Sequence, residues 1–131
     1  MSEQYVSRAE GRRLVARSKQ FNIDNGAGTT DDCCVLRHSQ PIRLKAARVV
    51  YTDATTGTVA AATIQLGVAV AGATIIAATA LENTKAIGTS TALTLLLTDV
   101  AANTPLIARH TGVATTAAGE YNLELEYVVL N

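Results

Sequence analysis

The chain has 131 residues and a formal net charge of zero, which indicates a single domain large enough to hold its own core. Charged residues make up only 17% and aromatic residues 4%, with no Trp, so small and β-branched side chains must fill that core. This composition favours thin, tightly packed β-structure and argues against a ligand pocket walled with aromatic rings.

The basic residues are concentrated at the start of the chain. Residues 1–48 hold nine basic and five acidic residues, a net +4, whereas residues 49–131 hold two basic and six acidic residues, a net −4. Within the basic part, residues 22–32 form a polar, glycine-bearing stretch, NIDNGAGTTDD. We therefore predict that residues 1–30 form an extended basic arm that becomes ordered mainly on a partner, and that residues 31–131 form the domain. Tyr5 and Phe21 are too few to stack on single-stranded nucleic acid, so no nucleic-acid partner is expected.

Adjacent cysteines, Cys33 and Cys34, open the first expected strand, at residues 33–38. Neighbouring Cα atoms lie about 3.8 Å apart, closer than a relaxed disulfide allows, so two reduced thiols are expected. A zinc site would need further ligands, and only His38 lies nearby in the sequence. The N-terminal stretch lacks the apolar run of a signal peptide, which favours a protein made and retained in the cytoplasm.

The next expected strand alternates Ile42 and Leu44 with basic residues and then slips to Val49 and Tyr51, as a β-bulge would cause. Beyond it, residues 59–81 contain no charge and are long enough to span a bilayer, which takes about 20 residues. Ala, Thr and Gly dominate this stretch, however, and its large residues fall on every second position: Ile64, Leu66, Val68, Val70. We predict two strands joined by a turn at Gly72, with a membrane helix as the alternative.

Period-two patterns continue to the end of the chain. Leucines alternate at residues 93–97, Pro105 precedes a short strand at residues 106–108, and residues 121–129 place an apolar face opposite an acidic one. Turn-forming residues separate all these runs. We therefore predict an all-β domain, a sandwich or barrel of about eight strands between residue 33 and the end. The core face of the last strand should carry Tyr121, Leu123, Leu125, Tyr127 and Val129.

The sequence offers little that could perform chemistry. No Gly-x-Ser-x-Gly elbow is present, and His38 and His110 are expected at the surface or at strand ends. Three acidic residues share one face of the last strand: Glu120, Glu124 and Glu126. Two of them could supply the carboxyl pair of a glycosidase, although a solvated face is the simpler expectation. The oxygen-bearing loop residues do not match EF-hand spacing: Asp24, Asn25, Asp31, Asp32. We expect no enzymatic activity, no cofactor and no bound metal.

Four segments carry a resemblance to a known class of proteins: IQLGVAV, KAIGTSTALTL, TPLIARHTG and AAGEYNLELEYVV. With the turns between them, in residues 49–131, they resemble the small virion structural proteins of tailed bacteriophages, and are most similar to capsid cement or decoration proteins. The resemblance implies a jelly-roll-like β-sandwich of antiparallel strands that forms a homodimer or homotrimer on the outer surface of the capsid. It transfers no catalytic residues.

The expected function is therefore that of a non-enzymatic cement protein in the virion, bound to the major capsid protein, with no membrane partner. A phage tail or fibre component and a carbohydrate-binding β-module remain as alternatives, and the scarcity of aromatic residues argues against the second. The basic arm lies outside the resemblance, and its role is inferred from charge alone. The residues expected to contact the capsid are Arg8, Arg12, Arg13, Leu14, Val15 and Arg17.

Overall fold

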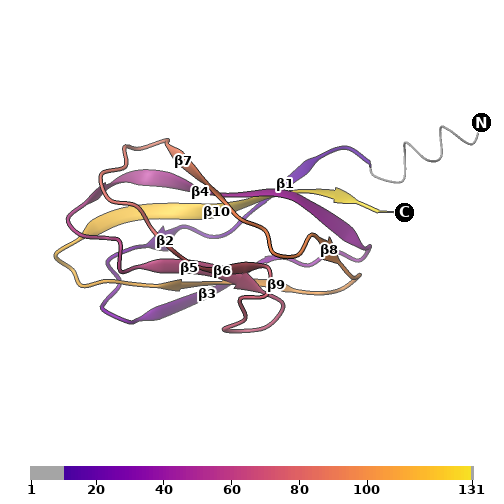
Figure 1. Cartoon of the computed structure of the whole chain (residues 1–131), viewed down its shortest axis with the longest axis horizontal. Coiled ribbons are helices and arrows are strands. Elements are labelled where there is room, and N and C mark those ends of the chain that lie inside the picture. The colour runs from indigo at the N-terminus through magenta and orange to yellow at the C-terminus, as the bar shows by residue number, and fades with distance from the viewer. Residues whose placement is uncertain (1–10, 131) are drawn as a thin grey trace, which may run out of the picture.

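The computed structural model describes residues 11–130, which form two antiparallel sheets and contain no helix. The sheets lie one above the other (Figure 1), so the prediction of an all-β sandwich is confirmed. In spatial order, the first sheet contains β1 (Leu14–Arg17), β10 (Ala118–Val129), β4 (Ile42–Thr56) and β7 (Ser90–Leu93), with β2 (Phe21–Asn22) beside β10 and β8 (Asp99–Val100) beside β4. The second contains β3 (Thr30–Leu36), β9 (Leu106–Thr111), β5 (Thr63–Gly67) and β6 (Ile76–Ala80).

The chain passes repeatedly from one sheet to the other. Leaving aside the two-residue strands, each sheet has four strands, and their order approximates that of a jelly roll. From Thr30 onward the described residues contain eight strands, β3 to β10, which matches the number expected from the sequence. The first and last strands, β1 and β10, are neighbours in the first sheet.

The uncharged stretch at residues 59–81 contains β5 and β6, so its strand prediction is confirmed. Within residues 11–130 no helix is long and apolar enough to cross a membrane. The prediction is wrong in one detail, because β5 ends at Gly67 and the side chains of Val68 and Val70 are exposed in the following loop. The loop turns back so tightly that a Cβ on Gly67 would lie 2.4 Å from the carbonyl carbon of Gly72.

The register slip expected near Val49 is present as a bulge. Glu126 and Tyr127 are adjacent in β10, but they pair with Ala46 and Leu44 of β4. Lys45, between those two partners, is therefore the extra residue. Two further shifts occur along the same pair of strands, and β4 accordingly uses 15 residues where β10 uses 12. Bulges increase the local twist of a strand pair, which lets these long strands curve over the core.

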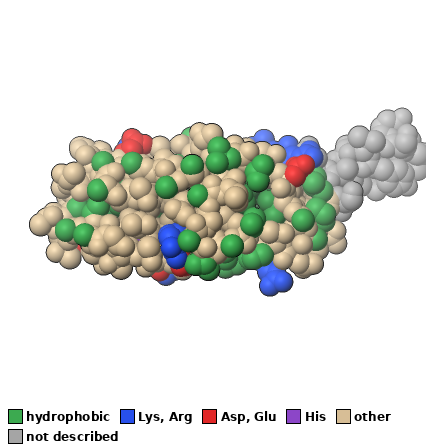
Figure 2. All heavy atoms as spheres, turned by 60° about the horizontal axis from the view of Figure 1, so that its bottom comes forward, with side chains coloured by type: hydrophobic (Ala, Val, Ile, Leu, Met, Phe, Trp, Pro, Cys, Tyr) green, Lys and Arg blue, Asp and Glu red, His purple; other side chains and the backbone are tan. Residues whose placement is uncertain are grey.

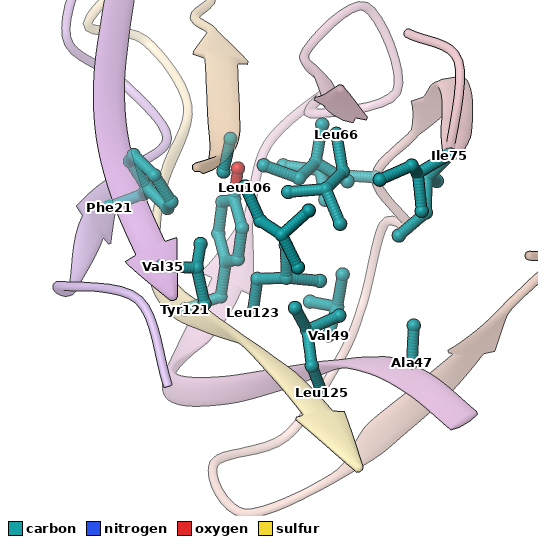
Figure 3. Packing of buried hydrophobic residues seen from close by; sticks show 14 of the residues in the cluster. Phe21, Val35, Ala47, Val49, Leu66, Ile75, Leu106, Tyr121, Leu123 and Leu125 are labelled. Atoms are coloured by element: carbon teal, nitrogen blue, oxygen red, sulfur yellow. The ribbon is translucent and has the colours of Figure 1, made fainter. Parts of the chain in front are cut away.

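The core lies between the two sheets (Figure 3). Leu66 and Leu106 approach it from the second sheet, and Val49, Leu123 and Leu125 approach it from β4 and β10. All five are at most 1% exposed, so the predicted core face of β10 is confirmed at its centre. Burying a side chain of this size contributes about 1.5–3 kcal/mol before the entropy of ordering is counted.

The structure corrects the predicted domain boundary at residue 31. β1 pairs with β10, with Leu14 opposite Tyr127, and β2 pairs Phe21 with Tyr121. Phe21 and Ile23 are fully buried. The part of the predicted arm between Leu14 and Thr30 therefore belongs to the sandwich, whereas residues 1–10 of that arm lie outside the described residues.

The alternation that places β1 in a sheet is real but short. Leu14 and Ala16 are partly buried against the core, whereas Val15 and Arg17 point to solvent. Without β1, the backbone N–H and C=O groups along that edge of β10 would have no strand partner, and buried backbone groups of this kind are almost always paired. The tertiary pairing, rather than the local sequence, therefore determines the structure of this segment.

Candidate functional site

The residues predicted to contact the capsid do not form one uniform exposed patch. Arg8 lies outside the described residues, Arg12 is exposed just before β1, and the side chain of Leu14 packs against the core. Val15 is 51% exposed. Whether this set binds a partner stays a prediction.

Arg13 and Arg17 are both paired within the chain. The Nη1 of Arg13 lies 3.2 Å from Oε1 of Glu126, and the Nε of Arg17 hydrogen-bonds Glu124. Arg48 on β4 contacts the same two carboxylates from the other side, at 2.9 Å to Glu124 and 2.5 Å to Glu126. Three arginines and two glutamates thus form an ion-pair ladder across β1, β10 and β4.

The electrostatics of the ladder keep both glutamates ionised. Burial raises the pKa of Glu124, but hydrogen bonds and charges from Arg17 and Arg48 outweigh this and bring the pKa below its ordinary value. The pKa of Glu126 is also lowered, chiefly by the hydrogen bonds from Arg48 and Arg13. The ladder therefore fastens β1 to the sheet, and it leaves Arg13 and Arg17 less available to an external carboxylate.

The same geometry corrects the expectation of a solvated acidic face on β10. Glu124 is only 7% exposed, because the strands on either side supply arginines that cover it. A glycosidase needs one carboxyl group with a raised pKa to act as the acid, whereas the pKa values of Glu124 and Glu126 are both lowered. This pair is therefore unsuited to acid catalysis.

The oxygen-bearing residues considered for calcium are not gathered around one point. Asp31 lies 2.5 Å from the Nζ of Lys19, and Asp32 accepts two hydrogen bonds from Arg109, at 2.7 and 2.9 Å. The amide of Asn25 donates to the carbonyl of Thr29. Among residues 11–130, no three His, Cys, Asp or Glu side chains are placed to hold a metal ion together.

A shallow hollow lies where the loop after β2 meets the loops after β4 and β9. Small side chains line it, among them Ala27, Thr58, Ala61 and Thr116, and no aromatic or charged side chain takes part. Sugar rings are usually held by aromatic faces together with a few placed polar groups. The hollow therefore offers no specific support for a carbohydrate site.

His110 is buried in the core, which corrects its expected surface position. It is 0% exposed, its Nδ1 lies 2.6 Å from the hydroxyl of Tyr121, and its ring stacks on Phe21 with 5.7 Å between centroids. Burial lowers the pKa of His110. His110 is therefore part of the core, where it packs against the rings of Phe21 and Tyr121.

Comparison with known proteins identifies a shared fold. No family model matches the chain, and no curated protein matches it. Among solved structures, a chain described under "Cyanophage Pam1 capsid asymmetric unit" aligns with a TM-score of 0.64 and 17% identity, over 92% of this chain and 86% of that one. At this identity the similarity establishes the fold, and it extends over nearly the whole chain.

Two further structures align much less well, each over 92% of this chain. One is described under "Bacillus endospore appendages form a novel family of disulfide-linked pili", with 20% identity over 94% of that chain, and the other is infectious bursal disease virus Gx strain, with 14% identity over 37% of that chain. Both have a TM-score of 0.31, too low to support any structural conclusion.

Proposed function

We propose that this chain is a non-enzymatic structural protein of a bacteriophage particle, and specifically a cement protein that binds the major capsid protein on the outer surface of the shell. The observation that carries the proposal is the match over nearly the whole chain to a chain of a cyanophage capsid.

Co-sedimentation of the purified chain with capsids that lack it tests the proposal. The chain should pellet with the capsids until a fixed number of sites is filled, and it should raise the temperature at which the shells open. Failure to pellet at physiological salt would overturn the proposal. Antibody labelling of intact particles separates the alternatives, because label confined to tails would instead favour a tail or fibre component.

The predicted contact residues can be tested in the same assay. Replacing Arg8 and Arg12 with Gln removes two charges from the predicted contact and leaves the ion-pair ladder intact. If the basic segment binds the shell, this variant should bind less tightly and with weaker salt dependence. The matched comparison sets Arg12→Gln alone against Arg37→Gln, because each removes one charge and Arg37 is exposed and basic but lies outside the predicted set. Equal loss of binding in both variants would argue against a specific contact at the N-terminal segment.

A further inference from the structure

Charge is distributed very unevenly around the sandwich. One side, where β1 and β3 are the edge strands, carries the ion-pair ladder and the Lys19–Asp31 pair. On the other side β6 and β7 are the edge strands, with the two-residue β8 beside β4 further along, and residues 54–81 and 86–98 contain no Asp, Glu, Lys or Arg at all. We call this second side the uncharged flank: β6, β7, the loop at residues 68–74 and the segment at residues 94–97.

The uncharged flank is a continuous part of the structure rather than two unrelated loops. The backbone N–H of Leu96 donates to the carbonyl of Ile75 at 2.7 Å, which ties the segment after β7 to the segment before β6. In Figure 1 the stretch between β7 and β8 crosses from the upper sheet toward the lower one. The flank is bordered by two ion pairs within the chain, Glu82–Lys85 at 3.2 Å and Arg43–Asp99 at 2.8 Å.

Most of the large hydrophobic side chains that are exposed in residues 11–130 lie on or beside this flank. In residues 11–130 six large hydrophobic side chains are exposed, and five of them belong to its uncharged stretches: Val68, Val70, Ile87, Leu96 and Leu97, at 44–69% exposure. The exposed side chains of β6 are alanines, and they add methyl groups between the larger residues. Figure 2 shows green hydrophobic side chains spread over this part of the molecule with few blue or red ones among them.

The edge strands differ in the same way. Soluble proteins commonly protect edge strands with charged residues or proline. Arg17 on β1 and Asp31 and Asp32 on β3 provide such charges, whereas β6 and β7 contain neither charge nor proline. A register shift between Ile64 and Leu66 places one extra residue in β6, so we expect this edge to meet a partner through side chains and not through a continued sheet.

We infer that the uncharged flank is the surface through which this chain binds a second copy of itself. Interface cores are depleted in charge, and two uncharged flanks can meet without like-charge repulsion or the cost of burying an unpaired charge. Val68, Val70, Leu96 and Leu97 are 44–63% exposed, and together with the exposed alanines of β6 they present on the order of 300–400 Å² of apolar surface, a large part of the roughly 450 Å² of apolar area in one side of a standard interface. The inference does not depend on the proposed function.

Sedimentation velocity of the full chain over concentrations from about 1 to 100 µM tests this inference. The wild-type chain should form a species of higher mass as the concentration rises. Val70→Asp and Leu96→Asp should each weaken self-association at least about tenfold, because each would place a charge in the interface core. Both side chains are more than half exposed, so each variant should keep a β-type circular dichroism spectrum, and Leu97→Asp replaces either variant if it does not.

The matched control is Val15→Asp, the same change at a similarly exposed valine on the charged side of the molecule. It should self-associate like the wild type, within about twofold. A wild-type chain that stays monomeric over the whole range would overturn the inference, as would equal weakening by Val15→Asp and Val70→Asp. A chain that self-associates through the flank but fails to bind capsids would contradict only the proposed function.

Discussion

Phe21→Ala tests whether the segment before β3 holds the domain together. The Phe21 side chain is 0% exposed, and its ring lies 5.7 Å from that of His110 and 5.4 Å from that of Tyr121. Truncating a buried Phe removes its transfer free energy and leaves a cavity, which together cost about 3–5 kcal/mol. A domain with a total stability of about 5–15 kcal/mol should therefore lose a large fraction of it.

Urea unfolding followed by circular dichroism gives the free energy of unfolding for Phe21→Ala and for a control, Val15→Ala. Val15 lies in the same segment but is half exposed, so its truncation should change stability by no more than about 0.5 kcal/mol. The melting temperature of Phe21→Ala should fall by roughly 10–20 °C. A loss below about 1 kcal/mol would refute the reasoning, because it would mean that this segment is an appended arm whose packing the domain does not need.

Three further predictions concern the core, the ladder and the thiols. Stability should fall as the pH drops below about 6.5, because the lowered pKa of buried His110 makes the unfolded chain the better proton acceptor. Urea unfolding at several pH values should show that His110→Gln flattens this dependence, and an unchanged dependence in this variant would contradict the assignment to His110. Leu125→Asp should abolish folding, whereas Glu124→Gln should fold and lose about 1 kcal/mol of stability at a pH above the ordinary Glu pKa of 4.5. The loss in Glu124→Gln should disappear at lower pH, where Glu124 is protonated in the wild type too. Equal stability of the two variants near neutral pH would contradict the assigned faces. Exposed Cys34 should react with a maleimide faster than partly buried Cys33. Mass spectrometry of the two single Cys→Ser variants measures the rates, and the reverse order would contradict the assigned orientation of β3.

The sequence predicts long alternating strands well and short ones poorly. In β10 the alternation of Leu123 and Leu125 with glutamates persists long enough to identify both faces. In β1 only four residues alternate, and basic residues surround them, so the same physical rule gives no clear signal. The leucine pattern at residues 93–97 shows the opposite error: Leu93 and Leu95 do pack against the core, but β7 ends at Leu93 and Leu97 is 54% exposed.

The surroundings of the predicted contact residues were beyond the sequence for a different reason. A count of charges shows that the N-terminal part is basic, but it cannot show which carboxylates those bases meet. Glu124 and Glu126 follow Arg13 and Arg17 by more than a hundred positions, and only the pairing of β1 with β10 brings them together. His110 is similar, because its ring stacks on Phe21, which comes from a segment that the charge pattern assigned to the arm.

The pairing of β1 with β10 also constrains how the protein can fold. Arg13 and Glu126 are separated by 113 positions, so β1 can find its partner only after the residues of β10 have been synthesised. Until then β1 and the side chain of Phe21 have no partner on β10, and the first sheet stays open at that edge. Contacts this distant in sequence slow folding, because the entropy of closing the loop is lost before any stabilising contact forms. We therefore expect completion of this sheet to be the late, slow step of folding and the partly folded chain to be most vulnerable to aggregation before it.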